Sequence, residues 1–197
     1  MSNAPGQVIG RAAASLNDSA AWADQGRAAV GAKGEKATAS VLNALAREPG
    51  GPSVVHDARI PIPGVKANID HLVVSGRTVT IIDSKMWKPG FYWTVFGRSY
   101  RGLTAFPSAD KRTLPMAVDG IEKYLATRGI TATVKRSLLV VWPSNRGAGL
   151  NLTFLRSPAA NAVTGDALQA SARRLVGRRT ADPLILAALA ELVYTGR

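Results

Sequence analysis

Two apolar segments separated by a short polar turn constrain the fold of this sequence more than any other feature. Residues 68–74 and 78–84 read as strands, and Ser75-Gly76-Arg77 lies between them. This pattern predicts an antiparallel hairpin, and glycine as the first residue of a two-residue loop suits a type II′ turn. The loop pairs residues whose numbers add up to 153, so we expect Asp70 opposite Asp83 and Asn68 opposite Lys85.

This register gathers polar side chains on one face of the hairpin. Side chains alternate between faces along a strand, so residues 68, 70, 83 and 85 project together. Cross-strand Cβ atoms lie about 4.5–5.5 Å apart, and two carboxylates at that distance repel unless a cation lies between them. We therefore expect Asp70 and Asp83 to share a hard divalent cation, with Lys85 positioning or deprotonating an attacking water.

Composition limits which metal this site can hold. The chain has no cysteine and only two histidines, which excludes thiolate and all-histidine zinc sites, so a carboxylate site for Mg²⁺ or Mn²⁺ is expected. Glu35, in the first turn of a predicted helix over residues 34–47, is a candidate further ligand or water holder. Two other readings stay open: an Asp-x-Lys pair is often a solvated strand face, and Glu35 could act only on the helix dipole.

The remaining segments predict an α/β fold, a mixed sheet flanked by helices with the antiparallel hairpin inside it. Strands are expected at residues 53–60, 91–96, 99–103 and 136–142, and helices at 110–127, 166–176 and 183–194. Residues 1–30 are rich in alanine and suit an arm or a marginal helix.

The charge balance indicates an anionic partner. Twenty-five Lys and Arg against 13 Asp and Glu give a net charge of +12, which favours nucleic acid, with an anionic membrane surface second. Between Asp83 and Asp110 there is no acid, and we expect nucleic-acid contacts from Trp87, Lys88, Arg98 and Arg101. Phe91, Trp93 and Val95 are expected to pack on the core instead. The sequence shows no apolar run long enough for a membrane span and no signal peptide, which favours a cytoplasmic location.

Four sequence blocks form a recognisable set: residues 31–35 (GAKGE), 55–57 (VHD), 68–74 (NIDHLVV) and 82–87 (IDSKMW). Together they resemble the nuclease-related domain (NERD) family, which is similar to the PD-(D/E)xK, restriction-endonuclease-like nucleases. The resemblance covers roughly residues 30–142 and implies Glu35, Asp70, Asp83 and Lys85 as the active-site set. The sequence departs from the family where Asp83 stands in place of a common Glu. It departs again where Phe106-Pro107 and Lys111-Arg112 replace a polar element before the next helix.

The resemblance implies three regions and a nuclease activity. The regions are an N-terminal arm or helix (1–30), a nuclease-like core (31–145) and basic and apolar C-terminal helices packed on the core (146–197). The expected function is hydrolysis of DNA phosphodiester bonds with Mg or Mn. The alternative is a catalytically inactive DNA-binding or adaptor domain on the same fold. A membrane-surface protein is a third possibility that rests on charge alone.

Overall fold

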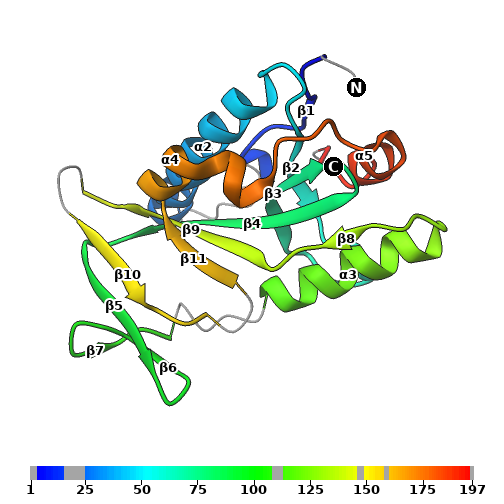
Figure 1. Ribbon diagram of the computed structural model, residues 1–197. Coiled ribbons are helices and arrows are strands. Elements are labelled where there is room, and N and C mark those ends of the chain that lie inside the picture. The colour runs from blue at the N-terminus through cyan, green and yellow to red at the C-terminus, as the bar shows by residue number, and fades with distance from the viewer. Residues whose placement is uncertain (1–3, 16–24, 108–112, 146–148, 158–159, 196–197) are drawn as a thin grey trace.

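A mixed β-sheet forms the centre of the protein, and helices cover both of its faces (Figure 1). The computed structural model describes residues 4–15, 25–107, 113–145, 149–157 and 160–195. The strand order is β1-β2-β3-β4-β9-β11, and β8 pairs beside the start of β4. The strands are β1 (Val8–Ile9), β2 (Ser53–Arg59), β3 (Asn68–Ser75), β4 (Thr78–Trp87), β8 (Thr133–Val134), β9 (Ser137–Pro143) and β11 (Ala160–Thr164). Strands β2, β3 and β4 are antiparallel, whereas β9 runs parallel to β4, so the predicted mixed sheet is confirmed.

The two faces of the sheet are buried by different helices. Helices α2 (Gln25–Ala46) and α4 (Gly165–Val176) cover one face, and α3 (Thr113–Thr127) and α5 (Pro183–Ala190) cover the other. Leu42 of α2 and Leu168 of α4 are fully buried against Val73 of β3, and Ile121 of α3 lies in the opposite core. Burying a side chain of this size stabilises the fold by about 1.5–3 kcal/mol.

The hairpin of β3 and β4 has the predicted register. Its pairs run from Ser75↔Thr78 to His71↔Ile82, and all of them add up to 153. Gly76 has φ +59°, the conformation that the first position of a type II′ turn needs. The turn therefore fixes which residues of the two strands face one another.

A second, smaller sheet projects from one end of the main sheet (Figure 1). It contains β5 (Gly90–Val95), β6 (Arg98–Arg101), β7 (Thr104–Ala105) and β10 (Leu150–Phe154), in the order β10-β5-β6-β7. Fully buried Tyr92 packs with Trp87 and Leu139 to join the two sheets. Side chains alternate between faces along β5, so Phe91, Trp93 and Val95 lie on the face opposite Tyr92. The expectation that these three side chains pack on the core is therefore wrong.

The C-terminal third differs most from the sequence prediction. Residues 146–197 were expected to form helices, but β10 and β11 precede α4 and α5. Both strands are only five residues long; β10 alternates apolar and polar residues (LNLTF), a signal that was overlooked, whereas β11 (ANAVT) shows no such alternation. Helix α2 begins at Gln25 inside the expected arm, and α5 ends at Ala190 rather than at residue 194. The expected start of the third helix, residues 110–112, lies outside the described residues.

Candidate active site

Asp70 and Asp83 lie where the β3–β4 ladder stops. The last recorded pair is His71↔Ile82, and the next residues in the same register are Asp70 and Asp83. Beyond this point the Asp70 carboxylate accepts a hydrogen bond from the backbone amide of Ser84 at 2.6 Å. The Asp70 carboxylate thus accepts a hydrogen bond from β4 just past the end of the backbone ladder, and this bond holds Asp70 against β4.

The polar residues of β4 separate two apolar clusters on the same face of the sheet. Ile81 belongs to the core under α3 and α5, and Trp87 belongs to the core under the small sheet. Asp83 and Lys85 occupy the positions between them and are both half-buried. A polar break between two apolar clusters needs a compensating interaction, because a buried charge without a partner is destabilising.

Lys85 supplies that interaction in this structure. Its Nζ atom lies 2.7 Å from the Asp83 carboxylate and donates to the carbonyl oxygen of Ser84 at 3.3 Å. Burial alone would lower the pKa of Lys85, but the carboxylates of Asp83 and Asp70 outweigh it and raise that pKa above its usual value. Lys85 is therefore a cation here, suited to orienting a water or stabilising negative charge rather than to removing a proton.

Glu35 approaches the same group of charges from helix α2. Gly34 allows this approach, since a Cβ at that position would lie 3.0 Å from Cγ of Met86 on β4. Burial, and then the negative charge of Asp57, raise the pKa of Glu35 from 4.5 to about 7. Burial followed by the charge of Asp83 raises the pKa of Asp70 well above its usual range. Glu35 and Asp70 therefore share one electrostatic environment with Asp83, and burial together with neighbouring carboxylates disfavours the charged form of both.

Asp57 is a fourth acid at this site, and the sequence analysis gave it no role. It is buried, has φ +52°, and lies level with Asp70, between the pairs His56↔His71 and Ala58↔Ile69. The loop from β2 to β3 is long, so no tight turn fixes this second register from sequence. Only the measured pairing brings Asp57 next to the predicted acids.

The N-terminal segment reaches the site and binds two of its acids. Ser15 donates to Asp57 through its backbone amide at 2.5 Å and its hydroxyl at 2.8 Å, and the Asn68 side chain adds a third donor at 2.8 Å. The Ala13 backbone amide hydrogen-bonds to Glu35. The described part of the expected arm is thus part of the site's surroundings, with β1 paired to β2.

A chain of buried hydrogen bonds supports the other side of β4. The Nδ1 atoms of His56 and His71 are 2.8 Å apart, and His71 Nε2 lies 3.1 Å from the hydroxyl of Ser84. Ser84 donates to Thr38 of α2 at 2.8 Å. Burial lowers the pKa of His56 to about 4 and that of His71 well below its usual range, so both rings are neutral and can each donate and accept. The network holds α2, β3 and β4 in fixed relation beneath Asp83 and Lys85.

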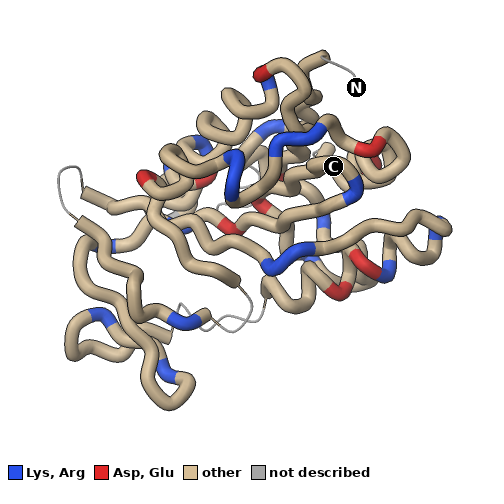
Figure 2. The backbone as a smooth tube through the Cα atoms, in the orientation of Figure 1, with Lys and Arg blue, Asp and Glu red and all other residues tan. Residues whose placement is uncertain are grey.

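The residues predicted to contact nucleic acid have different surroundings. Trp87 is only 6% exposed and packs against Tyr92 and Phe106, so its ring has no free face for a base. Lys88 and Arg98 are exposed, whereas Arg101 is half-buried beside Gly90. Figure 2 shows further basic residues, all of them arginines, at the end of α4 and in the segment that leads to α5. Within this group of basic residues, Arg173 forms an ion pair with Glu48.

The donor chemistry fits a hard divalent cation, although the described residues do not form a ready cage. The three predicted carboxylates and Lys85 carry a formal charge of −2 when all are ionised, and carboxylate oxygens are the ligands that Mg²⁺ prefers. Among the residues that the structure describes, no three His, Cys, Asp or Glu side chains are arranged to hold one ion. The ammonium of Lys85 instead lies between the oxygens of Asp83 and Ser84, where it acts as an internal counter-ion.

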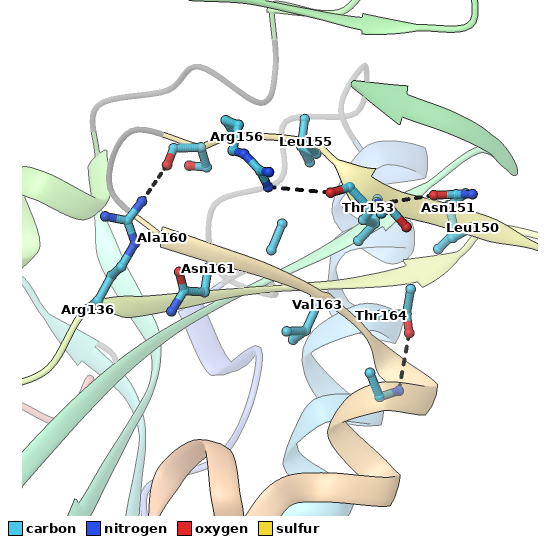
Figure 3. Close-up of a pocket in the computed structure, with 14 residues that line it drawn as sticks. Arg136, Leu150, Asn151, Thr153, Leu155, Arg156, Ala160, Asn161, Val163 and Thr164 are labelled. Atoms are coloured by element: carbon cyan, nitrogen blue, oxygen red, sulfur yellow. Dashed lines mark hydrogen bonds between the residues drawn. The ribbon is translucent and has the colours of Figure 1, made fainter. Parts of the chain in front are cut away.

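The described cavities lie away from these acids. One, of about 560 Å³, opens between β10 and β11 and is bordered by Arg136, Arg156, Asn151 and Thr164 (Figure 3). The other lies between α2 and α4. Neither cavity is lined by an acid of the candidate site, so we place the candidate site by its side-chain chemistry and not by cavity size.

Comparison with known families gives one match. Residues 30–114 match the family model of the nuclease-related domain, so this segment is similar to that family. The match includes Glu35, Asp70, Asp83 and Lys85, and it ends in the first turn of α3 rather than near residue 142. No curated protein and no solved structure matches the chain. No helix in the described ranges is long and apolar enough to cross a membrane.

Glu35 should make the metal-free protein less stable as pH rises. The pKa of Glu35 is about 7 in the folded protein and 4.5 in the unfolded chain. Its stabilising contribution to the free energy of unfolding is therefore fully present below pH 4.5 and is lost as pH rises to about 7. Because one pKa unit corresponds to about 1.4 kcal/mol, the loss is on the order of 3 kcal/mol. We expect Glu35→Gln to remove this loss, measured by urea unfolding in EDTA between pH 4.5 and 7.5.

The comparison of variant with wild type cancels the opposite trend of the buried histidines, whose lowered pKa values weaken the fold as pH falls below about 6.5. A Glu122→Gln variant, changed on the exposed face of α3, serves as the control. Parallel pH profiles for wild type and Glu35→Gln would contradict the assignment.

Proposed function

We propose that this protein is a metal-dependent nuclease that hydrolyses phosphodiester bonds of DNA. The observation that carries the proposal is the junction of β3 and β4, where Asp70, Asp83 and Lys85 meet at the end of a fixed ladder. The match to the nuclease-related domain supports a nuclease-related role for this segment. The net charge of +12 supports a polyanionic substrate.

In this proposal, Asp70 and Asp83 hold one Mg²⁺ or Mn²⁺, with Glu35 as a further ligand or water holder. The bound cation would neutralise the carboxylates and the substrate phosphate and make the attacking water more acidic. Lys85 turns from Asp83 toward the water or the phosphate oxygen, where its ammonium orients the one or stabilises charge on the other. As a water holder, Glu35 would accept a hydrogen bond from the attacking water.

The second candidate is a DNA-binding or adaptor domain without catalysis. What favours it is the closed pair of Lys85 and Asp83, which neutralises the site without a metal, and the absence of a three-ligand cage in the described residues. The two candidates differ in how the site responds to divalent cations and in the effect of losing Lys85. A cytoplasmic location remains a prediction for both.

Mg²⁺ or Mn²⁺ should raise the Tm of the wild-type protein. A cation that binds only the folded state stabilises it, and here it also relieves the repulsion between Asp70 and Asp83. We expect the double change Asp70→Asn and Asp83→Asn to abolish this rise. Because it also removes the carboxylate paired with Lys85, the Tm of the metal-free variant serves as its own baseline. Differential scanning fluorimetry across a metal titration measures both. A wild-type Tm that does not respond to either cation contradicts the shared site.

Lys85→Met should separate catalysis from binding. Methionine keeps much of the apolar stem and removes the ammonium, so DNA cutting should fall by ~100- to 10,000-fold while DNA affinity falls only modestly. The same variant should show a larger metal-induced rise in Tm than wild type, because the internal cation that competes for Asp83 is gone. Cutting of plasmid and linear DNA is measured with Mg²⁺, Mn²⁺ or EDTA.

Lys123→Met is the matched control, since Lys123 is an exposed lysine of α3 paired only with Asp119 among the contacts described. It should cut as wild type does. Equal cutting by wild type and Lys85→Met would show a contaminating nuclease, and no cutting of DNA or RNA by wild type would favour the adaptor.

A further inference from the structure

One face of the small sheet carries a row of aromatic side chains. Phe154 of β10 pairs with Trp93 of β5, Trp93 pairs with Tyr100 of β6, and Tyr100 pairs with Ala105 of β7. Paired residues on neighbouring strands point to the same face, so the aromatic row spans β10, β5 and β6 and ends at Ala105 of β7. Phe91 lies two residues before Trp93 and shares the face. We refer to Phe91, Trp93, Tyr100 and Phe154 as the aromatic face.

The aromatic face is turned away from the core. Tyr92, between Phe91 and Trp93, is fully buried, while Phe91 is 41% and Phe154 is 59% exposed. The rings of Trp93 and Tyr100 stack with centroids 5.0 Å apart, and those of Phe91 and Phe154 meet edge to face at 6.1 Å. Large apolar side chains rarely remain exposed as a contiguous group unless the group binds something.

The charge around the aromatic face indicates an anionic partner. None of β5, β6, β7 and β10 contains an Asp or a Glu. Exposed Arg98 pairs with Val95 and therefore shares the aromatic face. Arg156 lies two residues after the end of β10 and borders, with Arg136, the cavity between β10 and β11 (Figure 3).

We infer that the aromatic face binds single-stranded nucleic acid, with unpaired bases stacked on its rings and phosphates near Arg98 and Arg156. Exposed rings on a sheet surface with interspersed cations are suited to this ligand, because every unpaired base offers a flat face. In a duplex the base faces are already stacked on one another, so a duplex would contact only the cationic side chains of Arg98 and Arg156 and not the rings. The inference rests on the proposed function in one respect, that the substrate is nucleic acid, and it narrows that substrate to unpaired strands.

The position of the aromatic face suits delivery to the candidate site. Strand β5 follows β4 after two residues, and β4 carries Asp83 and Lys85. Trp87 and Tyr92 join the two sheets through a shared core, with ring centroids 4.9 Å apart. A nucleic-acid strand bound to the small sheet is therefore held by a part of the protein that packs against β4, the strand that carries the proposed catalytic residues.

Binding of fluorescent oligothymidylate and oligouridylate, measured by anisotropy in EDTA so that no cutting occurs, tests the inference. The double change Phe91→Ala and Phe154→Ala should weaken binding of the unpaired strand by roughly tenfold or more and change duplex binding little. The two oligonucleotides show whether the bound strand is DNA or RNA. Leu184→Ala is the control, since Leu184 is 66% exposed but lies on α5. Arg98→Ala should flatten the salt dependence of binding.

Unchanged affinity of the double variant for both oligonucleotides would overturn the inference, as would an equal loss for duplex and single strand. Loss of self-association in the double variant, with no loss of oligonucleotide binding, would overturn it too and assign the face to a second copy of the chain. The proposed function fails separately: wild type that binds oligothymidylate in EDTA but cuts nothing with Mg²⁺ or Mn²⁺ refutes the nuclease and leaves the aromatic face supported.

Discussion

The pairing of β3 with β4 is the constraint on which the rest of the structure depends. A two-residue turn with Gly76 at φ +59° sets the register, and the register decides which side chains of β4 face which core. Val79 and Ile81 then reach the core of α3 and α5, while Ile82 reaches the core of α2 and α4. A slip by one residue would exchange the two faces of the strand. It would bury Asp83 and Lys85 against helix α2 and expose their apolar neighbours.

The parts of the fold that sequence predicted are those with local rules. The hairpin was predicted because its turn is tight, and the helix of α5 because Asp182 accepts from the amides of Leu184 and Ile185 at its first turn. Strand β11 was missed because its stability comes from pairing with a distant strand, β9, and its residues do not alternate in polarity. Strand β10 also pairs with a distant strand, β5, but its alternation (LNLTF) was a short-range signal that was overlooked because it spans only five residues.

The residues of the candidate site likewise divide into those that a local rule predicted and those that only the structure brought together. Asp70, Asp83 and Lys85 followed from one hairpin register, and the structure places them together. The position of Asp57 did not follow from the sequence. Its register with β3 depends on an eight-residue connection over residues 60–67, and no turn rule fixes the conformation of that connection. The contacts of Ala13 and Ser15 with Glu35 and Asp57 join segments far apart in the chain, and small uncharged residues give no sequence sign of such a role. The aromatic face required knowing that Tyr92, and not its neighbours, is buried.

The position of β4 at the middle of the main sheet has a consequence for the choice of fragment boundaries. The segment recognised by sequence, 30–114, ends before β9 and begins after β1. A fragment cut to those limits would leave one side of β4 with unpaired amides and carbonyls over a long apolar strand, which is a template for edge-to-edge aggregation. It would also remove the donors that Ala13 and Ser15 give to two buried carboxylates. The segment that sequence comparison recognises is therefore shorter than the segment over which the strands of the central sheet pair.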